Sequence, residues 1–411
     1  MNFELITIGT ELLLGFTLDS NGAEIASALA ATGVRVVRRT SVGDRAQDIR
    51  QAVDEALKRT GAVLTTGGLG PTRDDVTKRA VAELFQAPLE FDDQVWADLL
   101  ARFARLLRKP APSNRSQAEV PRGATVLRNR WGTAPGLWLE GGPGLVIMLP
   151  GVPSEMRKLL EHEVLPRLAA RAGDSVIESL VIRTTGIPES SLAERMGNIE
   201  EEIEPLTLAY LPGLEGVDLR VSAWDMTPAD ADAQLGLAAQ LLRQRAGDHV
   251  YGEGGADLAG VVLDRLRDRG LRLGVAESCT GGLLGARLTE IPGSSDVFVG
   301  GVVTYANEMK TALLGVSPEL IAAHGSVSEP VAAAMARGAL ERLAVPVAVS
   351  VTGIAGPAGG SESKPVGTVC FGFAHDGRSE TRRTVFPGSR HEIRARAAQA
   401  ALFLVLRQLA D

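Results

Sequence analysis

The sequence predicts an α/β protein with two three-layer α/β domains joined by a small α+β module. Its 411 residues exceed one ordinary domain, and about 150 residues per domain suggests two or three. Its 46 glycines and 4% aromatic residues indicate many tight turns around cores of aliphatic side chains, which is typical of α/β proteins. Apolar strands alternate with amphipathic helices, and this favours a parallel sheet covered on both faces.

Composition and charge restrict the class of protein. With 45% hydrophobic residues the chain can bury full cores, and its net charge of −7 argues against a protein that coats nucleic acid. Cys279 and Cys370 are too far apart for a metal knuckle, so a reducing cytoplasmic compartment is expected. The N-terminus lacks the basic region of a signal peptide, and no segment approaches the ~20 apolar residues of a membrane span. We therefore expect a soluble protein without membrane contact.

The first domain begins with alternating strands and helices. Short apolar runs predict strands, and apolar residues at helical spacing predict helices, the first of them capped by Asp19, Ser20 and Asn21. The strands are expected at residues 3–8, 34–40 and 62–66, and the helices at 22–31, 49–59 and 76–85. A helix at 92–107, a mobile loop at 109–115, a small-residue turn at 129–136, strands at 137–139 and 145–149, and a helix through about 168 follow. The Pro-rich turn at 150–156 that introduces this last helix is interpreted as architectural.

The loop at residues 67–75 is one candidate site. Gly67, Gly68 and Gly70 would let backbone amides approach a phosphate, and the helix that follows adds positive potential at its N-terminus. The adjacent carboxylates of Asp74 and Asp75 could hold a divalent cation against that phosphate. The loop is neither a Walker A nor a dinucleotide-binding motif. A glycine-rich turn with an aspartate as helix cap remains the alternative.

A small module and a third region complete the chain. Composition shifts at 170–174; strands are expected at 175–185, 206–211 and 219–223, helices at 188–196 and 230–245, and a linker at 251–256. No catalytic cluster is evident in that module.

The last region is expected to alternate strands and helices again. Strands are expected at 271–276, 297–305 and 345–351, followed by a hairpin of 367–374 with 381–386. Helices are expected at 258–269, from 306, through 343 and, at the end, at 390–409.

The segment at 275–282 is the second candidate site. An apolar strand ends there in Ser278 and Thr280, and a helix begins after two glycines. Hydroxyls at a helix N-terminus can support a developing anion, although Ser278 or Thr280 could instead merely cap the helix. Tyr305, Thr352 and Gly353 also end strands, and such ends can gather at one crevice of a sheet.

A serine nucleophile needs a base, and the three histidines of the last region show no triad spacing. Lys310 follows the strand that ends at Tyr305, and a desolvated lysine can take a serine proton. A surface lysine is the commoner outcome. Cys279 is the competing nucleophile, but no histidine is placed to activate it.

These motifs together resemble the CinA family. The C-terminal part is similar through residues 276–282, 301–310, 326–330, 353–357 and 364–369, and the N-terminal part through 9–15, 19–21, 67–75 and 150–156. The resemblance implies a MoaB/MogA-like molybdopterin-binding fold at residues 1–170, a KH-like module at 171–252, and a CinA C-terminal amidohydrolase domain at 253–411. It covers almost the whole chain in the family's domain order.

The resemblance implies a bifunctional enzyme of pyridine-nucleotide recycling. The C-terminal domain would deamidate nicotinamide mononucleotide without a cofactor, with Ser278 as nucleophile, Lys310 as base and Tyr305 in support. The N-terminal domain would be an ADP-ribose pyrophosphatase that uses Mg²⁺, Mn²⁺ or Co²⁺. The expected metal ligands are Asp74, Asp75 and Asp19, and the expected substrate-binding residues are Thr280, Gly281, Thr352, Gly353, Arg390, Gly67, Gly68, Gly70, Thr72 and Asn21.

A homodimer is also expected, with no nucleic-acid partner. Two alternatives stay open: a molybdenum-cofactor enzyme, and a non-enzymatic accessory factor in competence or recombination with a basic or apolar docking surface. Fold analogy alone does not decide between hydrolysis and adenylyl transfer at the N-terminal site.

Overall fold

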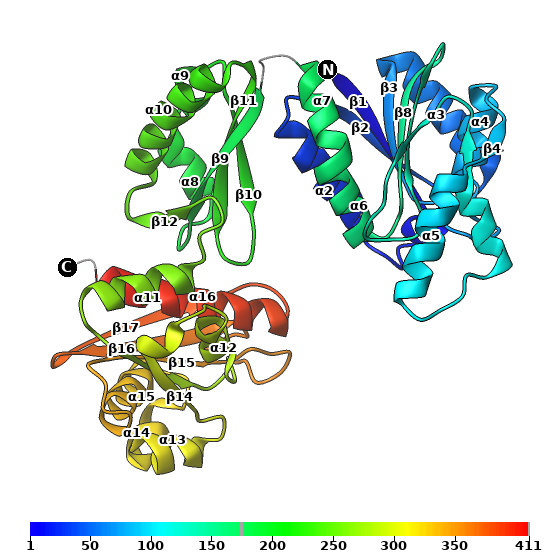
Figure 1. Cartoon of the computed structure of the whole chain (residues 1–411). Coiled ribbons are helices and arrows are strands. Elements are labelled where there is room, and N and C mark those ends of the chain that lie inside the picture. Colours follow the sequence, from blue (N-terminus) through cyan, green and yellow to red (C-terminus); the bar gives the residue numbers. More distant parts are fainter. Residues whose placement is uncertain (173–175, 410–411) are drawn as a thin grey trace. The chain divides into compact units, whose positions relative to one another are not determined.

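The computed structural model describes residues 1–172 and 176–409, which fold as two compact units (Figure 1). One unit contains Met1–Glu178 with Ala223–Gln234, and the other contains Ser179–Ser222 with Leu235–Asp411. The end of the predicted composition shift at 170–174 and the start of the strand predicted at 175–185 lie outside the described residues. Within the described residues, no helix is long and apolar enough to cross a membrane.

The first unit is built on a six-stranded sheet of order β2-β1-β3-β8-β7-β6. These strands are β1 (Asn2–Ile8), β2 (Arg35–Val42), β3 (Ala62–Thr66), β6 (Thr125–Leu127), β7 (Gly136–Gly141) and β8 (Gly144–Leu149). The first three and β8 pair in parallel, but β7 and β6 run antiparallel to their neighbours. The expectation of a parallel sheet is therefore wrong at this edge, because the tight turn between Gly141 and Gly144 reverses the chain without a crossover helix.

Helices cover both faces of this sheet. Ile25, Leu29, Met156 and Leu160 pack with Phe3 and Leu5 on one face, and Ile49, Val53 and Val81 pack with Ile6 and Ile8 on the other. The helices are α1 (Thr10–Leu13), α2 (Ser20–Ala30), α3 (Ala46–Thr60), α4 (Thr77–Leu84), α5 (Asp93–Arg105), α6 (Pro153–Leu159) and α7 (Leu165–Ala172), with a π-helical turn at Leu160–Val164. A small ladder pairs β4 (Leu89–Phe91) with β5 (Glu119–Pro121).

The loop predicted to be mobile at 109–115 is instead largely a 3-10 helix, Pro112–Ala118. Two buried side-chain amides hold it: Asn114 Nδ2 donates to Gln117 Oε1 at 2.9 Å, and Asn114 Oδ1 accepts from Ala111 N at 2.8 Å. The helix forms because these polar groups find partners inside the turn.

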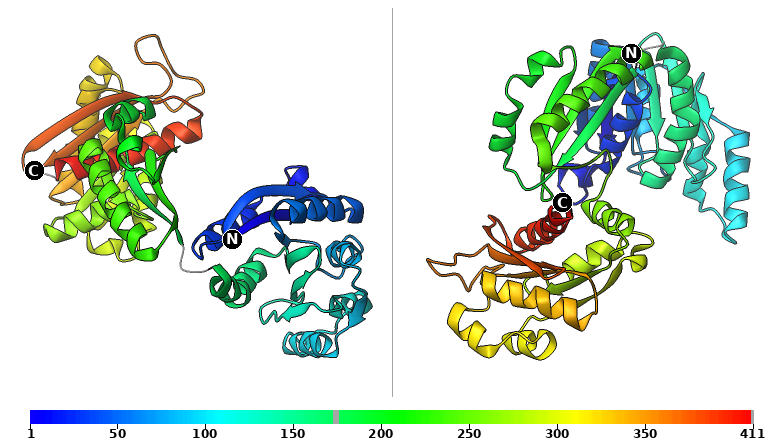
Figure 2. Two further views of the ribbon diagram at one scale, coloured as in Figure 1. Left: turned by 90° about the horizontal axis from the view of Figure 1, so that it is seen from above. Right: turned by 90° about the vertical axis from the view of Figure 1, so that its left-hand side faces the viewer.

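The C-terminal domain is also a three-layer structure. Its sheet has the order β14-β13-β15-β16-β17, with β13 (Leu273–Glu277), β14 (Phe298–Val303) and β15 (Val347–Gly353) parallel, and β16 (Thr368–His375) and β17 (Arg378–Val385) forming the predicted hairpin. One face is covered by α11 (Leu258–Asp268), α12 (Leu283–Thr289) and α16 (Arg390–Gln408). The other is covered by α13 (Asn307–Leu314), α14 (Pro318–His324) and α15 (Glu329–Arg342), as the right-hand view of Figure 2 shows.

A smaller module lies between these two domains in sequence. Its four-stranded sheet has the order β10-β11-β9-β12, with strands β9 (Val176–Thr184), β10 (Thr207–Pro212), β11 (Val217–Met226) and β12 (Val250–Glu253). Its helices are α8 (Glu189–Met196), α9 (Ile199–Glu202) and α10 (Pro228–Ala246). The linker predicted at 251–256 is wrong in its first half, because β12 pairs antiparallel with β9 and Tyr251 is buried. The overall α/β class with an additional α+β module is as predicted.

Two mid-helix glycines provide a test of this packing. A Cβ on Gly338 in α15 would lie 2.0 Å from the Leu314 carbonyl oxygen, whereas one on Gly236 in α10 would meet no atom within 4 Å. We expect Gly338→Ala to lower the free energy of unfolding by about 2 kcal/mol or more, because α15 must move away from α13. Gly236→Ala should raise it by up to about 1 kcal/mol through helix propensity. Chemical denaturation of both variants measures this, and equal effects would contradict the packing described.

Candidate active site

The buried hydroxyl of Ser278 lies directly beyond the end of β13. Its backbone N–H donates to the carbonyl of Val351 at 2.9 Å, so the chain still follows the sheet at this point. The next residues turn sharply through Gly281 and Gly282, which both have positive φ angles of 61° and 95°. Glycine adopts such angles without steric penalty, and α12 begins immediately afterwards. The sequence therefore places the hydroxyl at a sheet edge in a fixed orientation.

Lys310 forms the central contact of the site with Ser278. Lys310 Nζ donates to Ser278 Oγ at 3.0 Å and to the carbonyl of Thr304 at 2.8 Å. The lysine is in the first turn of α13, the helix that follows β14, and it is only 1% exposed. The contact with Ser278 joins two residues that are 32 positions apart in the chain.

Burial lowers the pKa of Lys310, because the charged ammonium loses its hydration; the nearby Cys279 and Glu308 oppose this shift. The lowered pKa makes the neutral amine accessible at a lower pH than for an exposed lysine. It also means that the unfolded chain holds this proton more firmly than the folded one. This group therefore makes stability increase with pH between its folded pKa and the ordinary value of 10.5.

The helix that follows Ser278 is capped by Glu277, not by a hydroxyl. The buried carboxylate of Glu277 accepts hydrogen bonds from the backbone N–H groups of Gly282 (2.9 Å), Leu284 (3.1 Å) and Gly285 (2.9 Å). The hydroxyl of Thr280 is buried and has no hydrogen-bond partner among the described residues. The alternative that Ser278 or Thr280 caps this helix is therefore wrong, because Glu277 already satisfies the helix N-terminus.

A second pair, Tyr305 and Arg390, stands at the mouth of the site. Arg390 Nη2 donates to the Tyr305 hydroxyl at 2.7 Å, and Arg390 Nη1 donates to the carbonyl of Gly356 at 2.8 Å. Tyr305 is 61% exposed, so it contacts Arg390 at the surface while the serine and lysine lie buried. The pair fixes a cationic guanidinium beside the buried hydroxyl.

The end of β15 forms the floor of the site. Thr352 Oγ1 donates to the carbonyl of Ser326 at 2.8 Å, so its hydroxyl proton is already engaged. A Cβ on Gly353 would lie 2.9 Å from Cys279 Sγ and equally close to the Thr368 carbonyl. This position therefore has no room for a side chain.

One cavity of about 130 Å³ brings most of the predicted C-terminal site residues together. Its lining is Ser278, Cys279, Tyr305, Asn307, Lys310, Ser326, Val327, Thr352, Gly353, Ala355 and Arg390. Thr280 and Gly281 are not part of this lining; the Thr280 carbonyl instead accepts from Arg394. Asn307 and Ser326 are lining residues that the sequence did not predict. Both adjoin the predicted strand ends and helix starts, and this position is the signal that could have found them.

The N-terminal candidate loop follows β3 and owes its shape to close packing. A Cβ on Gly67 would lie 2.2 Å from the Ile8 carbonyl, and one on Gly68 would lie 2.0 Å from Thr77 Oγ1. Thr72 N donates to Asp75 Oδ2 at 2.8 Å, and the Thr72 hydroxyl also donates to that carboxylate. The pKa of Asp74 lies below its usual value, with the nearby Thr72 side chain as the largest cause. Gly70 lies against the same Asp75 carboxylate.

Asp19 and Asn21 line a separate cavity of about 120 Å³ beside this loop. Asp19 Oδ1 accepts from Gly22 N at 2.8 Å as the cap of α2, and Oδ2 pairs with Arg39 at 3.2 Å. Asn21 Nδ2 donates to the Gly151 carbonyl at 2.8 Å, while Asn21 Oδ1 is buried without a partner among the described residues. Gly151 and Pro153 line this cavity too, so the turn interpreted as architectural borders a candidate site.

The expected metal ligands are not assembled as one set. Among the described residues, no group of three or more histidine, cysteine, aspartate or glutamate side chains is placed to hold a metal ion. Asp19 lines its cavity without Asp74 or Asp75, and both Asp19 and Asp75 already accept hydrogen bonds. A metal at this loop would therefore need further ligands from water or from a bound phosphate.

Comparison with known proteins matches three family models to successive parts of the chain. Residues 4–170 match the family described as a probable molybdopterin binding domain, residues 179–252 the damage-inducible protein CinA KH domain, and residues 255–409 the CinA C-terminal domain. A CinA-like protein of Gemmatimonas aurantiaca is 52% identical over 406 residues, covering 98% of this chain and 95% of its own.

Two further proteins are similar to the chain. A putative competence-damage inducible protein of Symbiobacterium thermophilum is 45% identical, covering 99% of this chain and 98% of its own. The crystal structure of a competence-damaged protein (CinA) superfamily protein of Klebsiella pneumoniae is 37% identical and covers 37% of this chain and 96% of its own, with a TM-score of 0.37.

The fold and the site define a multidomain α/β protein with a buried serine–lysine pair at a sheet edge. The family models that match residues 179–252 and 255–409 are CinA domains, and the relative that covers 98% of the chain is a CinA-like protein. The chain belongs to the CinA family.

The competing nucleophile Cys279 can be tested directly. Burial raises the pKa of its thiol to about 12, and the side chain is only 5% exposed. Because the thiolate is the reactive form, we expect neither Cys279 nor the buried Cys370 to react rapidly with a disulfide reagent at pH 8 in the native protein. Both should react after unfolding, and Cys279→Ala assigns the signal. One rapidly reacting thiol that this substitution removes would contradict the description.

Proposed function

We propose that the C-terminal domain is an amidohydrolase of nicotinamide mononucleotide, with Ser278 as nucleophile and Lys310 as base. The observation that carries the proposal is the 3.0 Å contact between Lys310 Nζ and Ser278 Oγ inside the protein. A hydroxyl is a weak nucleophile unless a base accepts its proton, and a desolvated amine supplies that base without histidine. The resemblance of the surrounding motifs to the CinA family supports this substrate.

The reaction proceeds in two steps. Ser278 Oγ attacks the amide carbonyl carbon while its proton passes to the neutral Lys310 amine. The carbon–nitrogen bond then breaks, Lys310 returns the proton to the leaving nitrogen, and ammonia departs from an ester on Ser278. Water, deprotonated by Lys310, attacks that ester and releases nicotinate mononucleotide and the serine hydroxyl. Atoms and charge balance, and no cofactor enters either step.

The Thr304 carbonyl orients the base for this transfer. This carbonyl accepts one hydrogen bond from Lys310 Nζ at 2.8 Å. That bond fixes the orientation of the amine, so that it also contacts Ser278 Oγ. At the mouth, Arg390 is held by Tyr305 and by the Gly356 carbonyl, where it can pair with the substrate phosphate. Tyr305 is thus a positioning residue for Arg390 in this proposal.

Ser278→Ala should lower ammonia release from nicotinamide mononucleotide by at least about 1000-fold, because the attacking atom is removed. Lys310→Met should have an effect of similar size, and ammonia production over time measures both. Cys279→Ala is the matched control and should retain activity. Full-rate deamidation by Ser278→Ala, or loss of activity only in Cys279→Ala, would refute the assignment.

We also propose that the N-terminal domain cleaves the pyrophosphate of ADP-ribose at the loop of residues 67–75. Backbone amides at Gly68 and Gly70 would face the phosphates, whereas the Gly67 amide already donates to the Leu149 carbonyl at 3.0 Å. Asn21, with its unpaired buried oxygen, would contact the nucleoside. Mg²⁺, Mn²⁺ or Co²⁺ bound by Asp74 or Asp75 and completed by substrate phosphates would polarise the phosphoryl oxygen and activate water. Asp19 remains engaged as a helix cap and is the least suited of the three expected ligands.

Asp74→Asn should reduce metal-dependent ADP-ribose cleavage by at least about tenfold while ammonia release is unchanged, because the exposed carboxylate is lost without a change in shape. Asp54→Asn, on the surface of α3, is the control and should leave both activities intact. Cleavage is measured from the released AMP at saturating Mg²⁺. Equal cleavage by the Asp74 variant would contradict the metal role. Tight binding of molybdopterin without ADP-ribose turnover would favour the molybdenum-cofactor alternative.

A further inference from the structure

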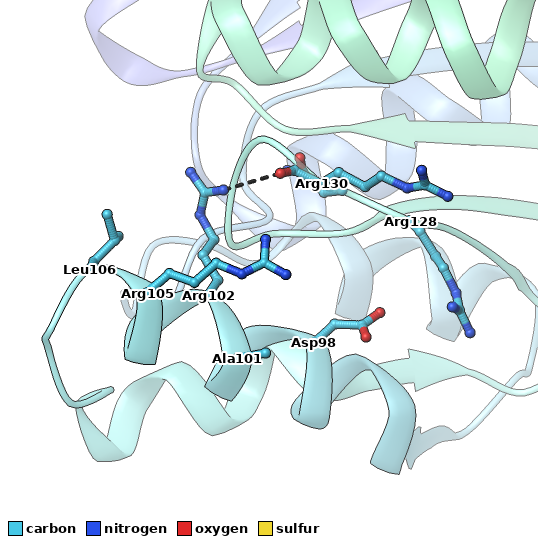
Figure 3. Close-up of a pocket in the computed structure, with 8 residues that line it drawn as sticks. Asp98, Ala101, Arg102, Arg105, Leu106, Arg128 and Arg130 are labelled. Atoms are coloured by element: carbon cyan, nitrogen blue, oxygen red, sulfur yellow. Dashed lines mark hydrogen bonds between the residues drawn. The ribbon is translucent and has the colours of Figure 1, made fainter.

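A large arginine-lined cavity in the first unit has no role in the sites described above. It measures about 480 Å³ and is lined by Asp98, Ala101, Arg102, Arg105, Leu106, Arg128, Asn129 and Arg130. Figure 3 shows Arg102 and Arg105 rising from α5 toward the segment that carries Arg128 and Arg130. This segment leads from β6 to β7. Four guanidinium groups from two separate parts of the chain therefore surround one hollow.

The positive charge of this cavity is poorly compensated. None of its four arginines lies within 4.0 Å of a carboxylate oxygen among the described residues, and Asp98 is the single acidic residue in the lining. Outside the lining, the Glu155 carboxylate interacts electrostatically with Arg102. Elsewhere in the same unit arginines do pair with acids, including Arg39 with Asp19, Arg59 with Glu4 and Arg157 with Glu24. Like charges held together without partners repel one another, and a bound anion would relieve this repulsion.

The walls of the cavity are held in place without an anion. Arg102 donates to the backbone carbonyl of Arg130 at 3.3 Å and to that of Trp131, which ties α5 to the opposite wall. The side chain of Asn129 donates to the Ala134 carbonyl at 2.7 Å and to Glu155 Oε2 at 2.6 Å, and its oxygen accepts from Gly132 N at 2.7 Å. The backbone that carries Arg128 and Arg130 is therefore fixed, and binding would have to order only the arginine side chains.

The cavity lies at the same edge of the sheet as the glycine loop. Leu127 at the end of β6 pairs with Gly136, Leu137 pairs with Met148, and Leu149 pairs with Thr66, the last residue of β3. The segments after β3, β8 and β6 therefore leave the sheet on one side. In α/β folds, ligands bind at the edge formed by the carboxyl ends of parallel strands.

We propose that this arginine cavity binds a small molecule carrying two or more phosphates. Arginine presents planar N–H pairs that match phosphate oxygens, and four arginines suit a polyanion better than a single carboxylate. The volume is within the range of small-molecule sites, whereas a nucleic-acid surface would be an extended basic stripe with stacking aromatic residues. The proposal goes beyond the proposed pyrophosphatase and stands whether or not ADP-ribose is cleaved.

The test is calorimetric titration of the full-length protein with inorganic pyrophosphate in the presence of a metal chelator. The wild type should bind, and Arg105→Ala/Arg128→Ala should weaken binding by at least about tenfold, because two charge-assisted contacts are lost. Arg105 and Arg128 are exposed and have no hydrogen-bond or ion-pair partner among the described residues, so their removal should leave folding intact. Arg38→Ala/Arg378→Ala removes the same charge at two exposed positions outside the cavity and should leave affinity within about twofold.

Wild-type failure to bind pyrophosphate, or equal affinity in the Arg105/Arg128 variant, overturns the proposal. Binding of a single-stranded oligonucleotide but not of pyrophosphate overturns it in favour of a nucleic-acid surface. Where pyrophosphate binding is lost in that variant, the KM for ADP-ribose identifies the source of the phosphates. A raised KM places the substrate's own pyrophosphate in the cavity, and an unchanged KM identifies a separate phosphorylated ligand.

Discussion

The C-terminal domain depends on the burial of one primary amine. Lys310 reaches from α13 into the interior, where its amine donates hydrogen bonds to Ser278 Oγ and to the Thr304 carbonyl. A charged ammonium is costly at such a place, because no carboxylate lies within 4.0 Å of it among the described residues to replace its hydration. Burial thus favours the neutral form, which is the form able to accept a proton. The environment that destabilises the charge is what makes the side chain useful as a base.

The surrounding backbone keeps the serine hydroxyl available for this contact. Glu277 accepts three N–H groups at the start of α12, a task usually performed by a serine or threonine, and Ser278 is consequently not used as a cap. At the opposite side, Gly353 leaves space for Cys279, whose thiol is buried with a raised pKa. The neighbouring hydroxyl and thiol therefore differ in environment: the Ser278 hydroxyl contacts an amine, and the Cys279 thiol is kept protonated.

Much of the fold follows from the sequence, because hydrophobic periodicity marks nearly every strand and helix of both large domains. The exceptions have physical causes. The antiparallel β7–β8 hairpin depends on the tight turn between Gly141 and Gly144. The segment predicted as a linker begins as a strand, because Tyr251 packs into the interior. The strand ends that form the C-terminal cavity could be anticipated, but Glu277 could not, since glutamate is an unusual cap and its reach depends on the turn at Gly281 and Gly282. The arginine cavity joins α5 to the β6–β7 segment, and no local pattern predicts such a meeting.

The ionisation of Lys310 tests the central claim most directly. The chain has only six lysines, so a protein labelled with ¹³C at the lysine Cε should give resolved signals, with Lys310 assigned by its absence from Lys310→Met and Lys78 by Lys78→Met. Lys78 is also buried, and its pKa is lowered to about 8, so it must be assigned separately. Titration of the native protein should give Lys310 a pKa clearly below the ordinary 10.5. A Lys310 signal that titrates at 10.5 or above would mean that burial does not destabilise the charged amine, and would contradict its proposed role as the base.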